Sequence, residues 1–310
     1  MSINVLFAAK AERWATYEPT LKQAFGELGL DVNLRTEIPP EDVDYIVYAP
    51  NSDLQDFIPF TRTKAVLGLW AGVEDVVGNQ TLIQPFARMV DEGLTRGMVE
   101  WVTGHVLRHH LGMDIHILGQ DGLWRDHVPP LATDRSVTIL GLGALGQACA
   151  EALAFLGFTV TGWSRSAKEV PGVTCLSGND RLAEALSGAE IVVLLLPSTP
   201  QTENTLNADT LALLAPGAVV INPGRGPLID DEALLSAVNT GQVGHATLDV
   251  FRVEPLPPEH PYWSHPNVTV TPHIASETRP LSASRVIAEN VRRGEAGEDF
   301  INLVDRKLGY

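Results

Sequence analysis

Apolar runs of five to seven residues recur along the chain and are separated by amphipathic stretches. In the first third, the runs are INVLFAA (3–9), YIVYAP (45–50) and KAVLGLW (64–70). From Ser136 onward they are more regular: SVTIL (136–140), FTVTG (158–162), IVVLLL (191–196), AVVIN (218–222), HATLDV (245–250) and NVTVT (267–271). Continuous apolar runs are typical of strands that are buried on both faces of a parallel sheet. The pattern therefore predicts an α/β protein of the doubly wound type.

Helical patterns lie between these runs, for example in DRLAEALSG (180–188) and DDEALLSAVNTG (230–241). A longer helical pattern extends from about Gly97 to Leu118, and its start is a natural hinge between two domains. A further amphipathic helix is expected after residue 275, with Val286, Ala288 and Val291 on its apolar side.

Length and charge limit the class of protein. A chain of 310 residues with 45% hydrophobic and 19% charged residues can bury a large core and form two domains. The net charge of −16 argues against nucleic acid or an anionic membrane as a partner, since binding to phosphate needs a positive surface. An acidic protein can still carry a local basic pocket for an anionic ligand.

Cysteine content and the first residues favour a reducing compartment. The two cysteines, Cys149 and Cys175, form neither a CxxC motif nor a disulfide framework. The start MSINVLFAAKAERW lacks the apolar run of a signal peptide, and the chain has no apolar stretch long enough for a membrane span. We therefore expect a cytoplasmic protein that does not bind a membrane.

GLGALG follows directly after the predicted strand 136–140 and precedes a helical pattern at 147–156. In this GxGxxG motif, Gly141 permits a tight turn, Gly143 lets a pyrophosphate approach the backbone, and Gly146 lets the helix pack on the sheet. The strand–turn–helix setting predicts a dinucleotide-binding site. Methyltransferases that use S-adenosylmethionine have similar glycine loops and are an alternative, which the basic loop described next makes less favourable.

The loop after the next strand lacks the acidic residue that usually holds the ribose of NAD. Ser164 stands 164 − 141 = 23 residues after the first glycine, where an acid is expected. Arg165 can bind a 2′-phosphate bidentately, and Ser166 and Lys168 add a donor and a charge. The sequence therefore predicts NADPH/NADP as the cofactor, with NADH bound more weakly.

Three polar residues follow successive predicted strands of the same region. Arg225 lies in INPGRGPLID, Glu254 in DVFRVEPLP and His273 in TPHIAS. Reduction of a 2-oxo acid needs a cation for the substrate, a proton donor for its oxygen, and a carboxylate that orients the donor. The three residue types match these roles, and parallel strands bring their carboxyl ends to one edge of a sheet.

GLGALG, NPGRG, DVFRVEPLPPEHPYW and TPHIAS, in this order and spacing, resemble the D-isomer-specific 2-hydroxyacid dehydrogenases. The resemblance covers essentially the whole chain. GWSRS, AGVED at 71–75, TRP at 278–280 and the ending VDRKLGY resemble the glyoxylate/hydroxypyruvate reductases of that family. The family implies a Rossmann nucleotide domain, here 98–274, and a flavodoxin-like substrate domain from 1–97 and 275–310, with a cleft between them. It also implies a homodimer.

The resemblance assigns roles to particular residues. Arg225 would bind the substrate carboxylate and keto oxygen, His273 would be the general acid, and Glu254 its partner. Other implied substrate contacts are Tyr48, Trp70, Ala71, Gly72 and Val73. The implied cofactor contacts are Gly141, Gly143, Ala144, Leu145, Gly146, Ser164, Arg165, Ser166, Lys168, Leu196, Pro197, Thr202, Pro223, Gly224, Arg225, Asp249, His273, Ala275 and Ser276.

The resemblance thus implies NADPH-dependent reduction of small 2-oxo acids: glyoxylate to glycolate and hydroxypyruvate to glycerate. Trp70 replaces a small residue and Tyr48 stands where a tryptophan is frequent, so the preferred oxo acid stays open. A dehydrogenase of a bulkier 2-hydroxy acid is one alternative. A non-catalytic scaffold that senses dinucleotide is another, and the complete set of Arg225, Glu254 and His273 favours an enzyme.

Three further signals have structural explanations as well as functional ones. His105 and His109 are four residues apart on one helical pattern, but no HExxH glutamate accompanies them, and we expect no metal. Arg88 could contact the substrate or pair with a neighbouring acid. Trp124, in QDGLWRDHVPP, is either a plug between domains or the tip of a loop that reaches the partner subunit's site.

Overall fold

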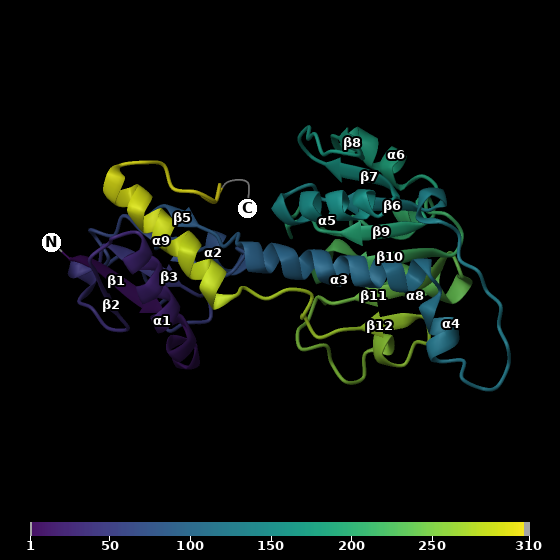
Figure 1. Ribbon diagram of the computed structural model, residues 1–310, viewed down its shortest axis with the longest axis horizontal. Coiled ribbons are helices and arrows are strands. Elements are labelled where there is room, and N and C mark those ends of the chain that lie inside the picture. The colour runs from purple at the N-terminus through teal and green to yellow at the C-terminus, as the bar shows by residue number, and fades with distance from the viewer. Residues whose placement is uncertain (1, 307–310) are drawn as a thin grey trace. The chain divides into compact units, whose positions relative to one another are not determined.

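The computed structural model describes residues 2–306, and the chain divides into two compact units. One unit is formed by the residues up to Leu94 together with those from Glu277 onward, and the other by Thr95–Ser276. Each unit is built around one sheet whose neighbouring strands pair in parallel (Figure 1). The sequence placed the two limits at 97 and 275. No break in the chain marks the first limit, because one continuous helix passes through it.

The first unit has a five-stranded sheet in the order β2-β1-β3-β4-β5. Its strands are β1 (Ile3–Ala8), β2 (Val32–Arg35), β3 (Tyr45–Tyr48), β4 (Ala65–Gly68) and β5 (Phe86–Ala87). Its helices are α1 (Ala11–Glu27), α2 (Glu74–Val77) and α9 (Pro280–Ala296). Leu21 of α1 and Ile287 of α9 are buried in the same core as Val5 and Val47 of the sheet, so the end of the chain completes the core begun at its start.

The second unit has a seven-stranded sheet in the order β12-β11-β10-β9-β6-β7-β8. Its strands are β6 (Ser136–Leu140), β7 (Thr159–Ser164), β8 (Val173–Ser177), β9 (Ile191–Leu194), β10 (Ala218–Asn222), β11 (Val243–Leu248) and β12 (Val268–Val270). Its helices are α4 (Met113–Ile117), α5 (Ala144–Phe155), α6 (Leu182–Leu186), α7 (Ala208–Leu211) and α8 (Asp231–Thr240). Two apolar clusters cover the two faces of this sheet, which explains the continuous apolar runs.

The longest helix differs from its predicted limits. α3 extends from Glu92 to His110, so it begins and ends earlier than the predicted 97–118. Gly112 has φ of +61°, a left-handed conformation that glycine adopts at little cost, and it separates α3 from the short helix α4. The helical periodicity of the sequence therefore continues past His110, whereas the helix itself is interrupted there.

Three strands had no counterpart among the apolar runs. β2 and β8 are edge strands whose residues are mostly half-exposed, and β5 has two residues. Their sequences, VNLR, VTCLS and FA, are too short or too polar to form a continuous apolar run. Among residues 2–306, no helix is both long and apolar enough to cross a membrane.

Candidate active site

The glycine loop joins the end of β6 to the start of α5. Gly141 has φ of +108°, and a Cβ atom there would lie 2.6 Å from backbone atoms of Leu195. A Cβ atom at Gly146 would lie 1.7 Å from the carbonyl oxygen of Gly141, so the helix approaches the strand too closely for any side chain. At Gly143, by contrast, a Cβ atom would meet nothing within 4 Å.

This contrast fits a dinucleotide. Gly143 is the N-cap of α5, and Gly143 and Ala144 are exposed while Leu145 is half-buried. The first N–H groups of a helix lack partners within it and attract phosphate. The loop therefore leaves open space in front of a helix N-terminus, which is the space that a pyrophosphate requires.

The basic loop lies beside the glycine loop because β6 and β7 pair in register. The N–H of Gly141 donates to the carbonyl of Trp163 at 2.8 Å, so the end of β7 adjoins the turn. Ser164 is buried, and its hydroxyl donates to the carbonyl of Ser166 at 2.8 Å. Arg165, Ser166 and Lys168 are exposed. The serine thus shapes the loop, and its exposed neighbours are the groups that can reach a phosphate.

The loop after β9 is held by its own side chains. The hydroxyl of Thr202 donates to the carbonyl of Pro197 at 2.6 Å and accepts from the N–H of Thr199 at 2.9 Å. Leu196 is buried, and Pro197 is half-buried. These contacts fix a turn at the same edge of the sheet as the glycine loop, since β9 pairs with β6.

Asn222, which the sequence analysis did not single out, forms the turn that carries Arg225. Its buried side-chain amide donates to the carbonyl of Arg225 at 2.9 Å and accepts from the N–H of Gly224 at 3.1 Å. Arg225 is half-buried, and its Nη1 donates to the carbonyl of Gly224 at 2.7 Å. Pro223 and Gly224 are buried. Asparagine is common in turns, so its position at the end of a predicted strand is the sequence signal by which Asn222 could have been found.

His273 and Glu254 form a direct contact. His273 Nδ1 lies 2.7 Å from Glu254 Oε2, and Glu254 Oε1 accepts from the N–H of Phe251 at 2.9 Å. The two side chains keep 49% and 35% of their surface exposed. The carboxylate therefore fixes the orientation of the imidazole and leaves Nε2 as the nitrogen for a reacting group. The sequence expected this pair, and the structure brings it together.

Asp249 holds the turn that presents His273. Its carboxylate is fully buried and accepts from the Thr271 hydroxyl at 2.5 Å and from the N–H groups of Ile274 and Ala275 at 2.9 and 2.8 Å. Its carbonyl accepts from the N–H of His273 at 2.8 Å. His273 has φ of +54°, which is uncommon for a residue other than glycine and needs such support. The contact of Asp249 with a cofactor stays a prediction, as do those of Ala275, which is buried, and Ser276.

Among the predicted substrate residues of the first unit, Tyr48 is the last residue of β3, and residues 70–73 follow β4. The ring of Tyr48 is buried against Phe57, 5.2 Å away, whereas Trp70 is exposed. Among residues 2–306, the N–H groups of Ala71, Gly72 and Val73 have no hydrogen-bond partner. Free N–H groups in a row can receive a carboxylate. The loop has the donors that this role requires.

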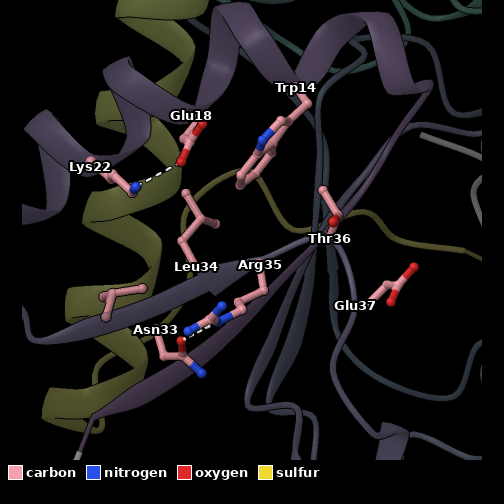
Figure 2. A pocket seen from close by; sticks show the side chains of 9 residues that line it. Trp14, Glu18, Lys22, Asn33, Leu34, Arg35, Thr36 and Glu37 are labelled. Carbon is pink, nitrogen blue, oxygen red and sulfur yellow. Dashed lines mark hydrogen bonds and ion pairs between the residues drawn. The ribbon is translucent and has the colours of Figure 1, made fainter.

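A cavity of about 530 Å³ lies elsewhere on the first unit, between α1 and β2 (Figure 2). Trp14, Glu18, Lys22 and Arg35 are among the residues that line it, and Glu18 and Lys22 form an ion pair of 2.7 Å. None of the predicted site residues lines it. The cavity is therefore separate from the residues considered above.

The structure shows the surroundings of the other residues that the sequence singled out, which are two histidines, Trp124 and Arg88. His105 packs against Trp101, with ring centroids 4.2 Å apart, whereas His109 bonds to Thr247, so the two imidazoles have different neighbours. The side chain of Trp124 is 95% exposed and does not plug a core. Arg88 is half-buried, and burial lowers its pKa while the nearby Glu74 raises it.

A glycine loop, a basic loop and a histidine–carboxylate pair at the carboxyl ends of one parallel sheet define the class: a dinucleotide-binding protein with an acid–base pair. The family model for the NAD binding domain of D-isomer specific 2-hydroxyacid dehydrogenases matches residues 105–275. The chain is 40% identical to glyoxylate/hydroxypyruvate reductase A of Serratia proteamaculans over 257 residues, 80% of this chain and 82% of that protein. The chain belongs to the D-isomer specific 2-hydroxyacid dehydrogenase family.

Two solved structures are similar along their full length. A D-isomer specific 2-hydroxyacid dehydrogenase of Xanthobacter autotrophicus, in complex with NADPH and MES, has a TM-score of 0.93 and 40% identity, with 100% of both chains covered. An NADPH-dependent glyoxylate/hydroxypyruvate reductase of Sinorhizobium meliloti, in complex with NADP and sulfate, has a TM-score of 0.86 and 32% identity with the same coverage. The predicted family and fold class are confirmed.

Two glycine substitutions in one loop should have different effects. Gly143→Ala should fold normally but weaken NADPH binding, because its methyl group would fill the space in front of the helix. Gly146→Ala should instead lower the melting temperature or prevent folding, because its Cβ atom has no room. Thermal unfolding and fluorescence titration with NADPH would separate the two effects. Unchanged NADPH affinity in Gly143→Ala would contradict the assignment of this loop.

Proposed function

We propose that the protein reduces small 2-oxo acids with NADPH, converting glyoxylate to glycolate and hydroxypyruvate to glycerate. The observation that carries this proposal is the 2.7 Å contact between His273 Nδ1 and Glu254 Oε2 at the edge of the sheet that holds the glycine loop. The names of the relatives in Serratia and Sinorhizobium support the choice of substrates and cofactor. Two free cysteines and the use of NADPH are in keeping with a reducing cytoplasm.

In this proposal, the two units have different tasks. The unit of Thr95–Ser276 binds the dinucleotide. In the other unit, the backbone N–H groups of Ala71, Gly72 and Val73 are suited to a carboxylate. Arg225 binds the carboxylate and the keto oxygen through guanidinium N–H groups, which match a carboxylate in geometry. Trp70, exposed in its loop, limits the size of the side chain that the oxo acid carries.

His273 is the general acid. Glu254 holds Nδ1–H, so that the protonated ring presents Nε2–H to the keto oxygen of the substrate. The proton moves from Nε2 to the oxygen as negative charge develops there, and the carboxylate stabilises the imidazolium until that transfer. When bound, NADPH supplies the hydride to the keto carbon.

Oxidation of NADPH should be observed with glyoxylate and hydroxypyruvate, and less efficiently with pyruvate and phenylpyruvate. His273→Ala should lower kcat by about 10²- to 10⁴-fold without weakening NADPH, because the proton donor is lost and the dinucleotide contacts stay. Steady-state rates and direct titration of the cofactor measure the two effects.

His265→Ala is the matched control, because His265 lies on the turn before β12 and contacts Asn239 rather than Glu254. Its rates should equal those of the unaltered protein. Full turnover by His273→Ala would exclude it as the general acid. Preference for phenylpyruvate would favour a dehydrogenase of bulkier acids, and binding of NADPH without turnover of any acid would favour a sensing scaffold.

The preference for NADPH is assigned to Arg165, with Ser166 and Lys168 beside it. A hydrogen bond to a charged group contributes about 1.5–3 kcal/mol, and each 1.4 kcal/mol is tenfold in affinity. Arg165→Ala should therefore weaken NADPH by roughly ten- to a hundredfold and leave NADH nearly unchanged, since NADH has no 2′-phosphate. The ratio of kcat/KM for the two cofactors at fixed ionic strength measures this. If that ratio is unaffected, Arg165 does not contact the phosphate.

A homodimer is part of the proposal. Large apolar side chains gather on one segment of the second unit and are exposed: Ile115, Ile117, Leu118, Leu123, Trp124, Val128 and Leu131. Contiguous exposed apolar residues mark interaction sites in soluble proteins. A second copy of the chain is the occupant that the family suggests, with Trp124 reaching the partner's site.

Trp124→Ala should then change KM or the range of oxo acids and leave the affinity for NADPH nearly unchanged. Trp263→Ala is the control, since Trp263 is also exposed but lies outside the apolar segment. Sedimentation velocity of the unaltered protein should give the mass of a dimer. A monomer with unaltered KM in Trp124→Ala would refute both parts of this assignment.

A further inference from the structure

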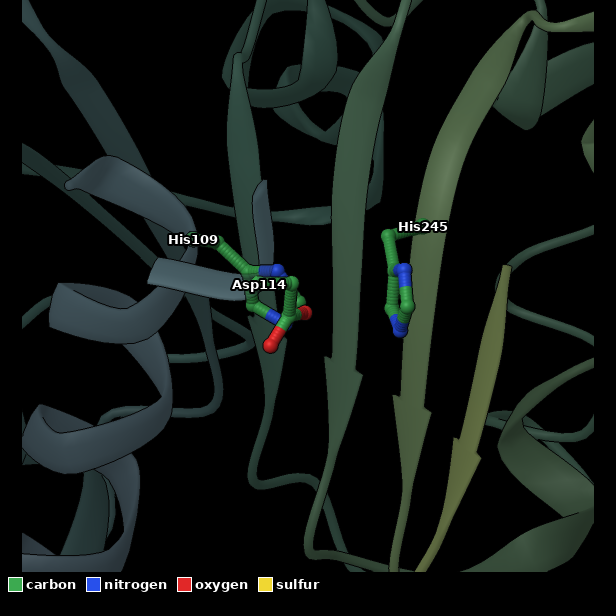
Figure 3. Close-up of side chains that lie close together, drawn as sticks. All are labelled: His109, Asp114 and His245. Atoms are coloured by element: carbon green, nitrogen blue, oxygen red, sulfur yellow. The ribbon is translucent and has the colours of Figure 1, made fainter. Parts of the chain in front are cut away.

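Three side chains with ligating atoms meet in the second unit, away from the residues of the proposed reaction. His109 is at the end of α3, Asp114 is in α4, and His245 is in β11. One nitrogen or oxygen from each lies within 4.8 Å of the others, and Figure 3 shows the side chains gathered between the helix end and the sheet. From the sequence, His109 was paired only with His105. His245 lies 245 − 109 = 136 residues further along the chain, and no sequence spacing indicates a contact over that distance.

The break between α3 and α4 creates this arrangement. Gly112, with its left-handed φ, ends α3 and starts α4. A straight continuation of α3 would carry residue 114 past His109, whereas the turn brings Asp114 back to it. The ring centroids of His109 and His245 are 4.8 Å apart, so the two imidazoles are direct neighbours.

Both imidazoles are oriented by threonine hydroxyls. His109 Nε2 lies 2.8 Å from the Thr247 hydroxyl, and His245 Nε2 lies 2.9 Å from the Thr269 hydroxyl. Among residues 2–306, neither Nδ1 atom has a hydrogen-bond partner. Histidines that bind metals commonly use one nitrogen for the metal and the other for a fixed polar partner. His109 and His245 each have one nitrogen held by a threonine hydroxyl and a second nitrogen that can serve as a ligand.

All three side chains are half-buried, so an ion bound between them would be partly shielded from water.

Arg108 is a competitor for the same carboxylate. Its Nε lies 2.9 and 3.0 Å from the two Asp114 oxygens, and its Nη2 lies 2.7 Å from Oδ2. Both partners are partly exposed, at 23% and 29%, so this ion pair is screened by water. A bound cation would share the carboxylate with the guanidinium, which limits the affinity.

We propose that His109, Asp114 and His245 bind a divalent transition-metal ion of the zinc and cobalt class. Two imidazoles with one carboxylate suit these ions, whereas magnesium and calcium prefer oxygen ligands throughout. Three protein ligands leave a fourth position for water in a tetrahedral site. The ion joins α3, α4 and β11, and so stabilises the folded second unit rather than taking part in the reduction.

The probe is Co²⁺, titrated into the full-length protein after treatment with a chelator. The unaltered protein should show the visible absorption of tetrahedral Co²⁺ at one ion per chain and a higher melting temperature. His245→Gln should abolish the absorption or weaken Co²⁺ at least about tenfold, since losing even an outer partner of a ligand costs about 10- to 100-fold in metal affinity. His116→Gln, which changes an exposed imidazole on α4 outside the cluster, should bind Co²⁺ like the unaltered protein.

Circular dichroism and NADPH affinity, both without metal, show that the variants are folded. Arg108→Gln provides a second test with the opposite sign. Removing the competing cation should tighten Co²⁺ by roughly two- to fivefold, the fold-change that corresponds to a partly exposed ion pair. Absence of the absorption in the unaltered protein, or equal binding by His245→Gln, would overturn the site. Unchanged or weaker binding by Arg108→Gln would overturn the place of Asp114 in it.

Discussion

The buried carboxylate of Asp249 is the contact on which the acid–base pair depends. It accepts three hydrogen bonds from the segment after β12, and the Asp249 carbonyl accepts a fourth from His273 itself. A buried carboxylate is costly unless such donors surround it, so the segment and the carboxylate stabilise each other. Together they hold His273 at a positive φ, where its ring meets Glu254. The side chains of His273 and Glu254 can stay partly exposed because the buried Asp249 carboxylate fixes the backbone around them.

Other loops at the carboxyl edge of the seven-stranded sheet are also held by polar side chains that bond to the loop backbone. Asn222 forms the turn that carries Arg225, Thr202 fixes the loop after β9, and Ser164 fixes the loop that carries Arg165. Parallel register brings these loops to one edge, although they are distant in sequence. Asn222 and Ser164 are buried and Thr202 is half-buried, and each forms hydrogen bonds with the backbone of its own loop.

The buried strands that lead to this edge could be predicted from the sequence, whereas the hydrogen bonds that hold its loops could not. Buried strands produce continuous apolar runs, so β6 and β10 were found at their observed limits. Half-exposed edge strands such as β8 have no such run, and the break at Gly112 does not disturb helical periodicity. His273 and Glu254 could be recognised from the sequence because each lies within a motif. The meeting of His109 with His245 depends on tertiary packing and leaves no mark in either segment.

The side chain of Arg225 is held by the backbone of its own turn. Its Nη1 donates to the carbonyl of Gly224, which holds the side chain in its turn. A guanidinium has five N–H donors in a planar fork, and the contact with Gly224 uses a donor on Nη1. The contact with the Gly224 carbonyl is charge-assisted, because the guanidinium is ionised. The turn formed by Asn222 keeps the backbone on either side of this contact in place.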